Sequence, residues 1–136
     1  MHASCVAVAG RAALIIGRSG CGKSGLALQL MALGAELVAD DVTELRRISE
    51  TLSASAPPTL AGLVEARGVG LLATEPARPA LVALVVDLDE TEKRRYPPVR
   101  TTMIGGVEIP MLRKVDGAHF PAAILQHLKG GRVGLP

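Results

Sequence analysis

Residues 17–24 read Gly-Arg-Ser-Gly-Cys-Gly-Lys-Ser and fit the phosphate-loop pattern G-x-x-x-x-G-K-[ST]. Chance places these four fixed residue types at this spacing in roughly 0.4% of chains of this composition. Glycines let a backbone wrap around phosphate oxygens, and the N–H groups at the start of a helix attract negative charge. The pattern therefore predicts phosphate binding, with a glycine-rich turn that only caps a helix as the alternative. The expected nucleotide contacts are Gly17, Arg18, Ser19, Gly20, Cys21, Gly22, Lys23 and Ser24.

Two side chains of this loop are expected to act directly on the phosphates. Lys23 reaches the β- and γ-phosphates of ATP in this motif, and the hydroxyl of Ser24 ligates Mg²⁺. Cys21 occupies a variable position, where a tolerated small residue is favoured over a redox-sensitive thiol. We interpret Cys5 and Cys21 as free thiols, because a domain with its own apolar core needs no disulfide.

The residues around the loop fit the strand, loop and helix order that the motif requires. Residues 12–16 form an apolar run of strand length, and we expect them to pair with residues 4–9 in a hairpin that turns at Gly10 and Arg11. Residues 23–33 place most of their apolar side chains on one helical face, and Gly34 supplies the helix stop.

The rest of the chain is expected to alternate short strands with loops and to end in a helix. Residues 80–86 are a continuous apolar run with three valines, typical of a strand buried on both faces of a sheet. Residues 116–129 predict a C-terminal helix, with Pro121 in its first turn. Further strands are expected at 36–39, 42–48 and 107–109, and loops at 53–58 and 75–79. The fold class is thus α/β, a mixed β-sheet with a helix after the phosphate loop and a helix at the C-terminus.

Length and composition limit the classes of function. A chain of 136 residues, 49% hydrophobic and 21% charged, predicts one domain over residues 1–136. A net charge of +2, with one Tyr, one Phe and no Trp, argues against charge-driven binding to nucleic acid or membranes and against base stacking. No apolar stretch near the N-terminus approaches the ~20 residues that span a bilayer, and no secretory signal is visible. The cytoplasm is the expected location.

Two neighbouring acids, Asp40 and Asp41, follow the strand predicted at 36–39. A helix that crosses back after the first strand should make this strand its parallel neighbour, which brings both carboxylates to the phosphates. One acid can hold Mg²⁺ or its water while the other accepts a proton from the attacking group, as phosphoryl transfer requires. The alternative is a solvated acidic turn.

Residues 15–47 resemble the core of HPr kinase/phosphorylase, in which a phosphate loop, one helix and an Ala-Asp-Asp triplet follow in close succession; they read IIGRSGCGKSGLALQLMALGAELVADDVTELRR. Residues 63–70, LVEARGVG, are similar to the family's Leu-Glu-Ile-Arg-Gly-Leu-Gly signature. His2 stands where the family has a histidine before its first strand. The resemblance covers residues 1–129 and implies an HPr kinase/PEP carboxykinase-like fold in its short form, without an N-terminal domain.

This resemblance implies an enzyme and its partners. The family phosphorylates a serine of HPr, a phosphocarrier protein of the phosphotransferase system, with ATP and Mg²⁺. It also removes the phosphoryl group from that serine by phosphorolysis, with phosphate and pyrophosphate as the small partners. It implies a homo-oligomer, by resemblance a hexamer, that regulates carbon or nitrogen metabolism. Neither nucleic acid nor a membrane is an expected partner.

The resemblance also assigns roles to individual residues. Asp40 would be the base for the serine hydroxyl, and Asp41 a carboxylate on the Mg²⁺ side, beside Ser24. Glu65 would support a second metal site, and His2 would lie beside the reacting phosphate.

The charged segment 90–98 corresponds to a family loop that contributes an arginine to a neighbouring subunit. Arg94 and Arg95 are the candidates, with a solvated corner as the alternative.

Two other functions compete with protein phosphorylation. One is a nucleotide-binding switch or sensor that binds ATP and signals by association, and the other is a small-molecule kinase. A switch needs no base for a seryl hydroxyl, so the paired acids favour transfer. A small-molecule kinase normally needs a lid and an acceptor pocket, and few residues remain to build either.

Overall fold

The fold is built on a hairpin of two buried strands next to the phosphate loop. In the computed structural model, which describes residues 1–133, β1 (Ser4–Val8) pairs antiparallel with β2 (Arg11–Ile16). Ala9 and Gly10 form the turn, and both have positive φ (51° and 78°), as the twist of a two-residue hairpin requires. The predicted hairpin is confirmed, with its turn one residue earlier than expected.

The main sheet of the described residues has eight strands, and six of them follow the order β3-β1-β2-β8-β10-β9. The other two extend it at the start of β8, where β5 pairs with β8 and β4 pairs with β5. β8 is parallel to both β2 and β10, whereas β3 is antiparallel to β1. The carboxyl ends of β2, β3, β8 and β10 therefore lie at one edge. The further bounds are β3 (Glu36–Ala39), β4 (Glu44–Ile48), β5 (Thr51–Ser55), β8 (Ala80–Thr91), β9 (Arg100–Ile104) and β10 (Val107–Lys114).

The place of β3 corrects one expectation from the sequence. β3 is not the direct neighbour of β2, because β1 lies between them and pairs with both. The tight turn after β1 lets β1 take the position beside β2, so the chain that returns from the helix must add outside it. β3 still runs in the same direction as β2, and its last residue, Ala39, reaches the edge that carries the phosphate loop.

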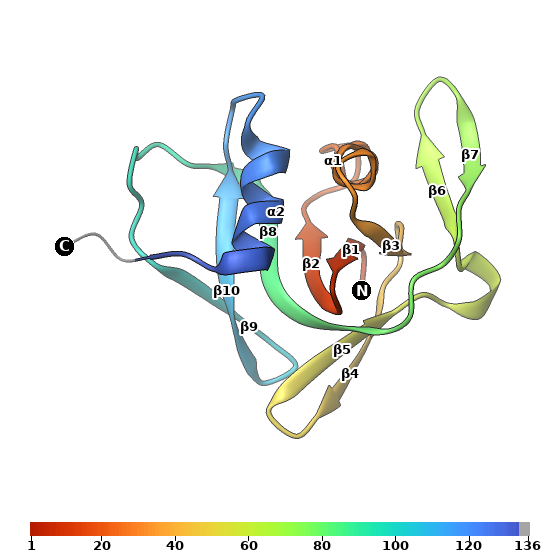
Figure 1. Ribbon diagram of the computed structural model, residues 1–136, viewed down its shortest axis with the longest axis horizontal. Coiled ribbons are helices and arrows are strands. Elements are labelled where there is room, and N and C mark those ends of the chain that lie inside the picture. The colour runs from red at the N-terminus through yellow and green to blue at the C-terminus, as the bar shows by residue number, and fades with distance from the viewer. Residues whose placement is uncertain (134–136) are drawn as a thin grey trace.

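Both helices cover the same face of the sheet, and Figure 1 shows them next to each other. The helix α1 (Lys23–Ala32) buries Leu26 and Leu30, and α2 (Phe120–Gly130) buries Ile124 and Leu128. These side chains belong to one apolar cluster with residues of β1, β2 and β8. Their burial fixes α1, and with it the phosphate loop, against the sheet.

β8 is buried on both faces, as its run of apolar residues predicted. Leu84 and Val86 contribute to the cluster under the helices, while Val85 points into a second cluster on the opposite face. Leu52 of β5 and Ile109 of β10 belong to that second cluster. β8 is therefore the centre of the fold and carries its polar end, residues 87–91, to the edge with the phosphate loop.

Several predicted boundaries differ from the structure. The predicted loop at 53–58 is wrong over its first half, because β5 extends to Ser55 and only the turn at η1 (Pro58–Leu60) follows. The strands predicted at 80–86 and 107–109 continue through polar residues, since backbone pairing between β8 and β10 does not need apolar side chains. The last helix begins at Phe120 rather than 116, with Pro121 in its first turn as predicted. A separate hairpin of β6 (Leu63–Ala66) and β7 (Gly70–Ala73) was not predicted.

Among residues 1–133, neither α1 nor α2 is long and apolar enough to cross a membrane.

Candidate active site

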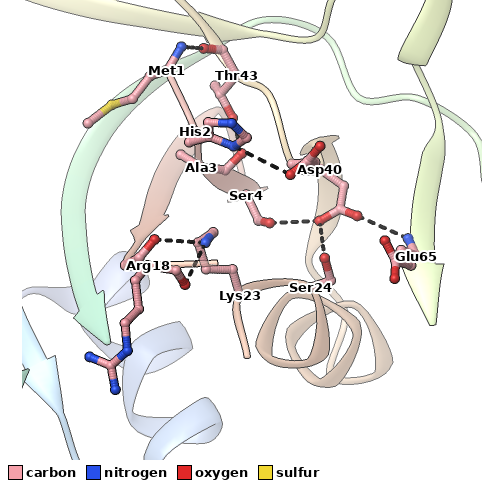
Figure 2. A network of polar contacts seen from close by, with 12 residues as sticks. Met1, His2, Ala3, Ser4, Arg18, Lys23, Ser24, Asp40, Thr43 and Glu65 are labelled. Atoms are coloured by element: carbon pink, nitrogen blue, oxygen red, sulfur yellow. Dashed lines mark hydrogen bonds and ion pairs between the residues drawn. The ribbon is translucent and has the colours of Figure 1, made fainter. Parts of the chain in front are cut away.

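The phosphate loop joins the end of β2 to the start of α1. Gly17, Gly20 and Gly22 have φ of 148°, 82° and 103°, in the region that disfavours residues with a Cβ. A Cβ on Gly17 would lie 2.6 Å from the Sγ of Cys21. The Nζ of Lys23 donates to the carbonyl oxygens of Gly17, at 2.7 Å, and Arg18, at 3.1 Å (Figure 2). Lys23 thus closes the loop over its own first residues.

A residue that the sequence analysis missed anchors the start of this loop. The backbone N–H of Arg18 donates to both carboxylate oxygens of Asp89, at 3.0 and 3.2 Å, and its guanidinium lies 3.3 Å from Oδ1. Asp89 belongs to the extended end of β8, beside β2. The signal in the sequence was an acid just after a continuous apolar strand, where ligands of α/β sheets collect.

Asp89→Ala is expected to weaken the binding of pyrophosphate by roughly ten-fold while leaving the fold intact, because Arg18 loses the acceptor of its N–H group. Asp89→Asn retains an acceptor oxygen and should bind more tightly than Asp89→Ala. Isothermal titration calorimetry measures both, with Glu90→Ala as the control for the loss of an exposed acid from the same strand. Tighter binding by Asp89→Ala would contradict the anchoring role and indicate simple repulsion.

Asp40 lies at the meeting point of three segments. Its carboxylate accepts hydrogen bonds from the hydroxyls of Ser4, at 2.6 Å, and Ser24, at 2.7 Å, and from the backbone N–H of Glu65, at 3.0 Å (Figure 2). Asp40 is only 6% exposed. Since the Ser24 hydroxyl uses its hydrogen to donate to Asp40, the lone pairs of its oxygen are left to bind another group, such as a metal ion.

Asp41 faces away from this network. Its φ of 66° turns the backbone immediately after Asp40, and its side chain is 70% exposed. His2 is held beside it by an isolated bridge to Val42, which leaves the Nδ1 of His2 3.5 Å from the Oδ1 of Asp41. The two neighbouring acids therefore differ in surroundings, one inside the protein and one in the open.

A cavity of about 380 Å³ opens above the phosphate loop. It brings together five of the residues predicted to act in catalysis or metal binding, with Arg67 of the β6–β7 turn beside them. Asp40 does not line it and lies beneath, behind Ser24. These five are His2, Lys23, Ser24, Asp41 and Glu65, and the cavity is also lined by Ser19, Gly20 and Gly22 of the predicted nucleotide contacts.

Arg94 and Arg95 lie outside this cavity, on the connection between β8 and β9. Figure 1 shows that connection at one edge of the molecule and the β6–β7 hairpin at the opposite edge. The base of the connection is fixed by Arg100, whose Nε lies 3.0 Å from the Oε1 of Glu92. This hydrogen bond is the main reason that the pKa of Glu92 is lowered to about 2. The two arginines are exposed and do not line the cavity of their own chain.

The oxygen donors of the cavity fit a magnesium ion held together with phosphates. Mg²⁺ usually binds through one or two carboxylates plus substrate phosphates, rather than in a cage of protein ligands alone. The cavity offers the Ser24 hydroxyl and the carboxylates of Asp41 and Glu65. No cluster of three or more His, Cys, Asp and Glu side chains arranged for a metal occurs in the described part of the chain.

Comparisons with known proteins give one matching family model and several similar relatives. The family model for the HPr serine kinase C-terminal domain matches residues 1–97. A relative from Nitrosomonas europaea, HPr kinase/phosphorylase, is 43% identical over 98 residues, which are 66% of this chain and 30% of that protein. HPr kinase/phosphorylase 1 from Oceanobacillus iheyensis is 34% identical over 132 residues, 90% of this chain and 40% of that protein. The chain thus spans less than half the length of these curated relatives.

A solved structure extends the comparison to the fold. The Hpr(Ser) kinase/phosphatase from Coxiella burnetii superposes with a TM-score of 0.75 at 25% sequence identity, and the match covers 95% of this chain and 93% of that one. The predicted α/β fold of the HPr kinase type is confirmed.

Proposed function

Because the chain belongs to the family of the HPr serine kinase C-terminal domain, we propose that it phosphorylates a serine of an HPr-like phosphocarrier protein with ATP. The observation that carries the proposal is the contact of Asp40 with both Ser24 and Glu65. This contact joins the phosphate loop to the hairpin that bears the family signature. The same site would run the reverse phosphorolysis, in which phosphate removes the phosphoryl group and pyrophosphate is formed.

The residues present suit the binding of ATP and Mg²⁺. The phosphate loop and Lys23 would hold the β- and γ-phosphates. Ser24 and Glu65 would hold Mg²⁺ from the open side of the cavity, which leaves Asp41 free for another role. When bound, the ion would offset the negative charge of the phosphates.

The surroundings of the two acids support roles that differ from those implied by the resemblance. A base must reach the acceptor hydroxyl within a hydrogen bond. Asp41 is exposed in the cavity, whereas the carboxylate of Asp40 already accepts three hydrogen bonds inside the protein. We therefore assign the base to Asp41 and treat Asp40 as a positioning residue that acts through Ser24. Contact with His2 would keep the Asp41 carboxylate in place.

Acid-stable phosphoserine is the product that tests the proposal. The protein is incubated with labelled ATP, Mg²⁺ and purified HPr-like carriers of the same organism. We expect label on one serine of a carrier, none when that serine is replaced by alanine, and release of pyrophosphate when phosphate is added afterwards. ATP binding without any labelled carrier would contradict the proposal and favour the switch or sensor; label on a small metabolite would favour the small-molecule kinase.

We also propose a homo-oligomer, a hexamer by family resemblance, in the cytoplasm, with control of carbon or nitrogen metabolism as its role. The exposed position of Arg94 and Arg95, away from the cavity of their own chain, supports a site completed by a neighbouring subunit.

Subunit complementation tests this arrangement. An inactive Lys23→Ala chain mixed with an inactive chain carrying Arg94→Ala and Arg95→Ala should regain part of the activity, since each supplies what the other lacks. Activity is measured after subunit exchange has been verified with two different tags. Mixed oligomers without activity would indicate a site built within one chain.

A further inference from the structure

The connection between β8 and β9, residues 92–99, has no regular secondary structure, but its two ends are fastened to each other. Glu92 is its first residue, and Arg100 is the first residue of β9. The Nε of Arg100 donates to Oε1 of Glu92, at 3.0 Å, and its Nη2 donates to Oε2, at 3.2 Å. The side chain of Glu92 is only 6% exposed, and that of Arg100 is 21% exposed. A two-pronged pair of this kind fixes the relative position of both side chains, and so closes the base of the connection.

The same carboxylate also holds the backbone of the connection. Oε2 of Glu92 accepts hydrogen bonds from the N–H groups of Lys93, at 3.1 Å, and Arg94, at 3.3 Å. The N–H of Glu92 itself donates to the carbonyl oxygen of Lys114 in β10, at 2.8 Å. Glu92 therefore ties the first residues of the connection to a fixed strand of the sheet.

The middle of the connection is held from another side. Arg132, just after α2, donates to the carbonyl oxygens of Pro97 and Pro98. The rings of these two prolines also fix their φ angles, which leaves the chain between them few conformations. The connection is thus exposed at the surface and yet restricted in conformation.

The part of the connection next to Glu92 carries three consecutive cations, Lys93, Arg94 and Arg95. All three residues are exposed, and within residues 1–133 none of them forms an ion pair with an acidic side chain. Like charges at neighbouring positions repel each other. A braced segment that carries unpaired positive charge is arranged to meet an anionic group from outside its own chain, because less conformational freedom is lost on binding.

The two arginines of this segment differ in their surroundings. The guanidinium of Arg95 lies over the ring of Tyr96, 5.3 Å from its centroid, in a cation–π contact. The side chain of Arg94 makes no hydrogen bond or ion pair within residues 1–133, and its backbone N–H is bound by Glu92. We propose that Arg94, rather than Arg95, completes the site of a neighbouring subunit, and that Glu92 is the residue that positions it. This inference rests on the proposed function in that the site is shared between subunits.

Position determines what such an arginine contributes. A guanidinium presents its N–H groups in a planar fork that matches phosphate oxygens, and it offsets the charge spread over a transferred phosphoryl group. A misplacement of about 1 Å can reduce a rate by roughly 100-fold. By holding the N–H of Arg94, Glu92 sets the point from which this side chain leaves the backbone before the subunits meet.

Single substitutions test the assignment through the rate of phosphoserine formation at saturating substrates. Arg94→Ala should lower kcat by at least about 100-fold, and Arg95→Ala by less than about five-fold. Glu92→Ala should lower kcat by roughly ten- to 100-fold, and Glu92→Gln by less, because its amide oxygen still accepts from one N–H group. The affinity for ADP, which lacks the transferred phosphate, should stay within about two-fold in all of them.

Glu108→Gln, at an exposed acid of β10, is the matched control and should leave kcat unchanged. Equal losses from Arg94→Ala and Arg95→Ala would overturn the choice of Arg94. A wild-type rate for Glu92→Ala would overturn the positioning role of Glu92.

Subunit complementation separates positioning from a general loss of structure. Glu92→Ala chains mixed with Lys23→Ala chains should regain activity, because the phosphate loop of the first meets the intact connection of the second. Glu92→Ala chains mixed with Arg94→Ala chains should keep the low rate, since neither presents Arg94 in position. The reverse pattern would mean that Glu92 supports the phosphate loop of its own chain, and would overturn the inference, as would a protein that sediments as a monomer.

Trypsin tests the fastening of the connection without any carrier protein, because it cleaves after Lys93, Arg94 and Arg95. Cleavage of the native protein at these bonds should be roughly ten-fold faster in Glu92→Ala and unchanged in Glu108→Gln. Rates for the unfolded proteins correct for the loss of an acid beside the cleaved bonds. Faster cleavage without any phosphorylated carrier would overturn the proposed function and keep the fastening by Glu92. A phosphorylated carrier with unchanged cleavage would overturn the role of Glu92 alone.

Discussion

Lys23→Ala is expected to reduce phosphoryl transfer to the carrier below detection, in both directions. Lys23 is the residue of the phosphate loop whose charge can reach the β- and γ-phosphates, and it lines the cavity with Ser24. Groups that stabilise developing charge in a water-poor site are typically worth ~10²- to 10³-fold in rate. The measurement is the rate of phosphoserine formation and the rate of phosphorolysis at saturating substrates.

Lys23→Ala is also expected to lower the stability of the protein. Lys23 also donates to the carbonyl oxygens of Gly17 and Arg18, so it does not serve the phosphates alone, as its position in the sequence suggested. Loss of these bonds should lower the free energy of unfolding by about 1–3 kcal/mol, which leaves the domain folded. Thermal unfolding separates this effect from the loss of transfer.

Lys129→Ala, an exposed lysine of α2, is the matched control and should change neither quantity. A folded Lys23→Ala protein with turnover close to normal would contradict the assignment of the phosphate loop.

The parts of the fold that were predicted are those determined by local sequence. The hairpin of β1 and β2 follows from two short apolar runs around a turn, and α1 follows from its apolar face and Gly34. The burial of β8 on both faces was evident because Val82, Val85 and Val86 occur in one unbroken apolar run.

The parts that were missed depend on pairing between distant segments. Nothing in residues 36–39 indicates that β3 pairs with β1 rather than β2, because both neighbours would bury the same apolar side chains. The polar end of β8 pairs through its backbone, so the strand continues through Asp87 and Asp89 without an apolar pattern. The acid after the apolar run was a signal for Asp89, but its contact with the N–H of Arg18 depends on how far β8 continues beside β2.

The candidate site likewise combines features that were predicted from the sequence with one that was not. The phosphate loop, His2 and Glu65 were placed in one cavity as the motifs implied. The sequence could not indicate which of the neighbouring acids faces the cavity, because that depends on one backbone torsion, the positive φ of Asp41. This torsion turns Asp40 toward Ser4 and Ser24 and leaves Asp41 exposed.

Asp41→Asn is the second change with a large expected effect. If Asp41 is the base, the same group must return a proton to the serine oxygen when phosphate cleaves the phosphoserine, since both directions cross one transition state. General-base catalysis typically contributes ~10²- to 10⁴-fold, so the kinase and phosphorolysis rates should fall together by that factor. Stability should hardly change, because asparagine tolerates positive φ and the side chain is exposed.

Asp40→Asn is the matched comparison and should alter different properties of the protein, namely its stability and its dependence on Mg²⁺. An amide is neutral and accepts hydrogen bonds only through its oxygen, so at least one of the donors Ser4, Ser24 and the N–H of Glu65 loses its acceptor. We expect a loss of stability of about 1–3 kcal/mol and a weaker dependence of nucleotide binding on Mg²⁺, because Ser24 is no longer held.

Three measurements on both variants decide between the acids: the two rates at saturating substrates, the thermal unfolding transition, and ADP affinity over a titration of Mg²⁺. An Asp40→Asn protein that is stable, binds nucleotide normally and has lost both rates would return the role of base to Asp40. Wild-type rates for Asp41→Asn would remove Asp41 from the chemistry. The expected pattern, with rates lost in Asp41→Asn and with stability and metal dependence altered in Asp40→Asn, follows from one carboxylate facing the cavity and the other fixing Ser24 beneath it.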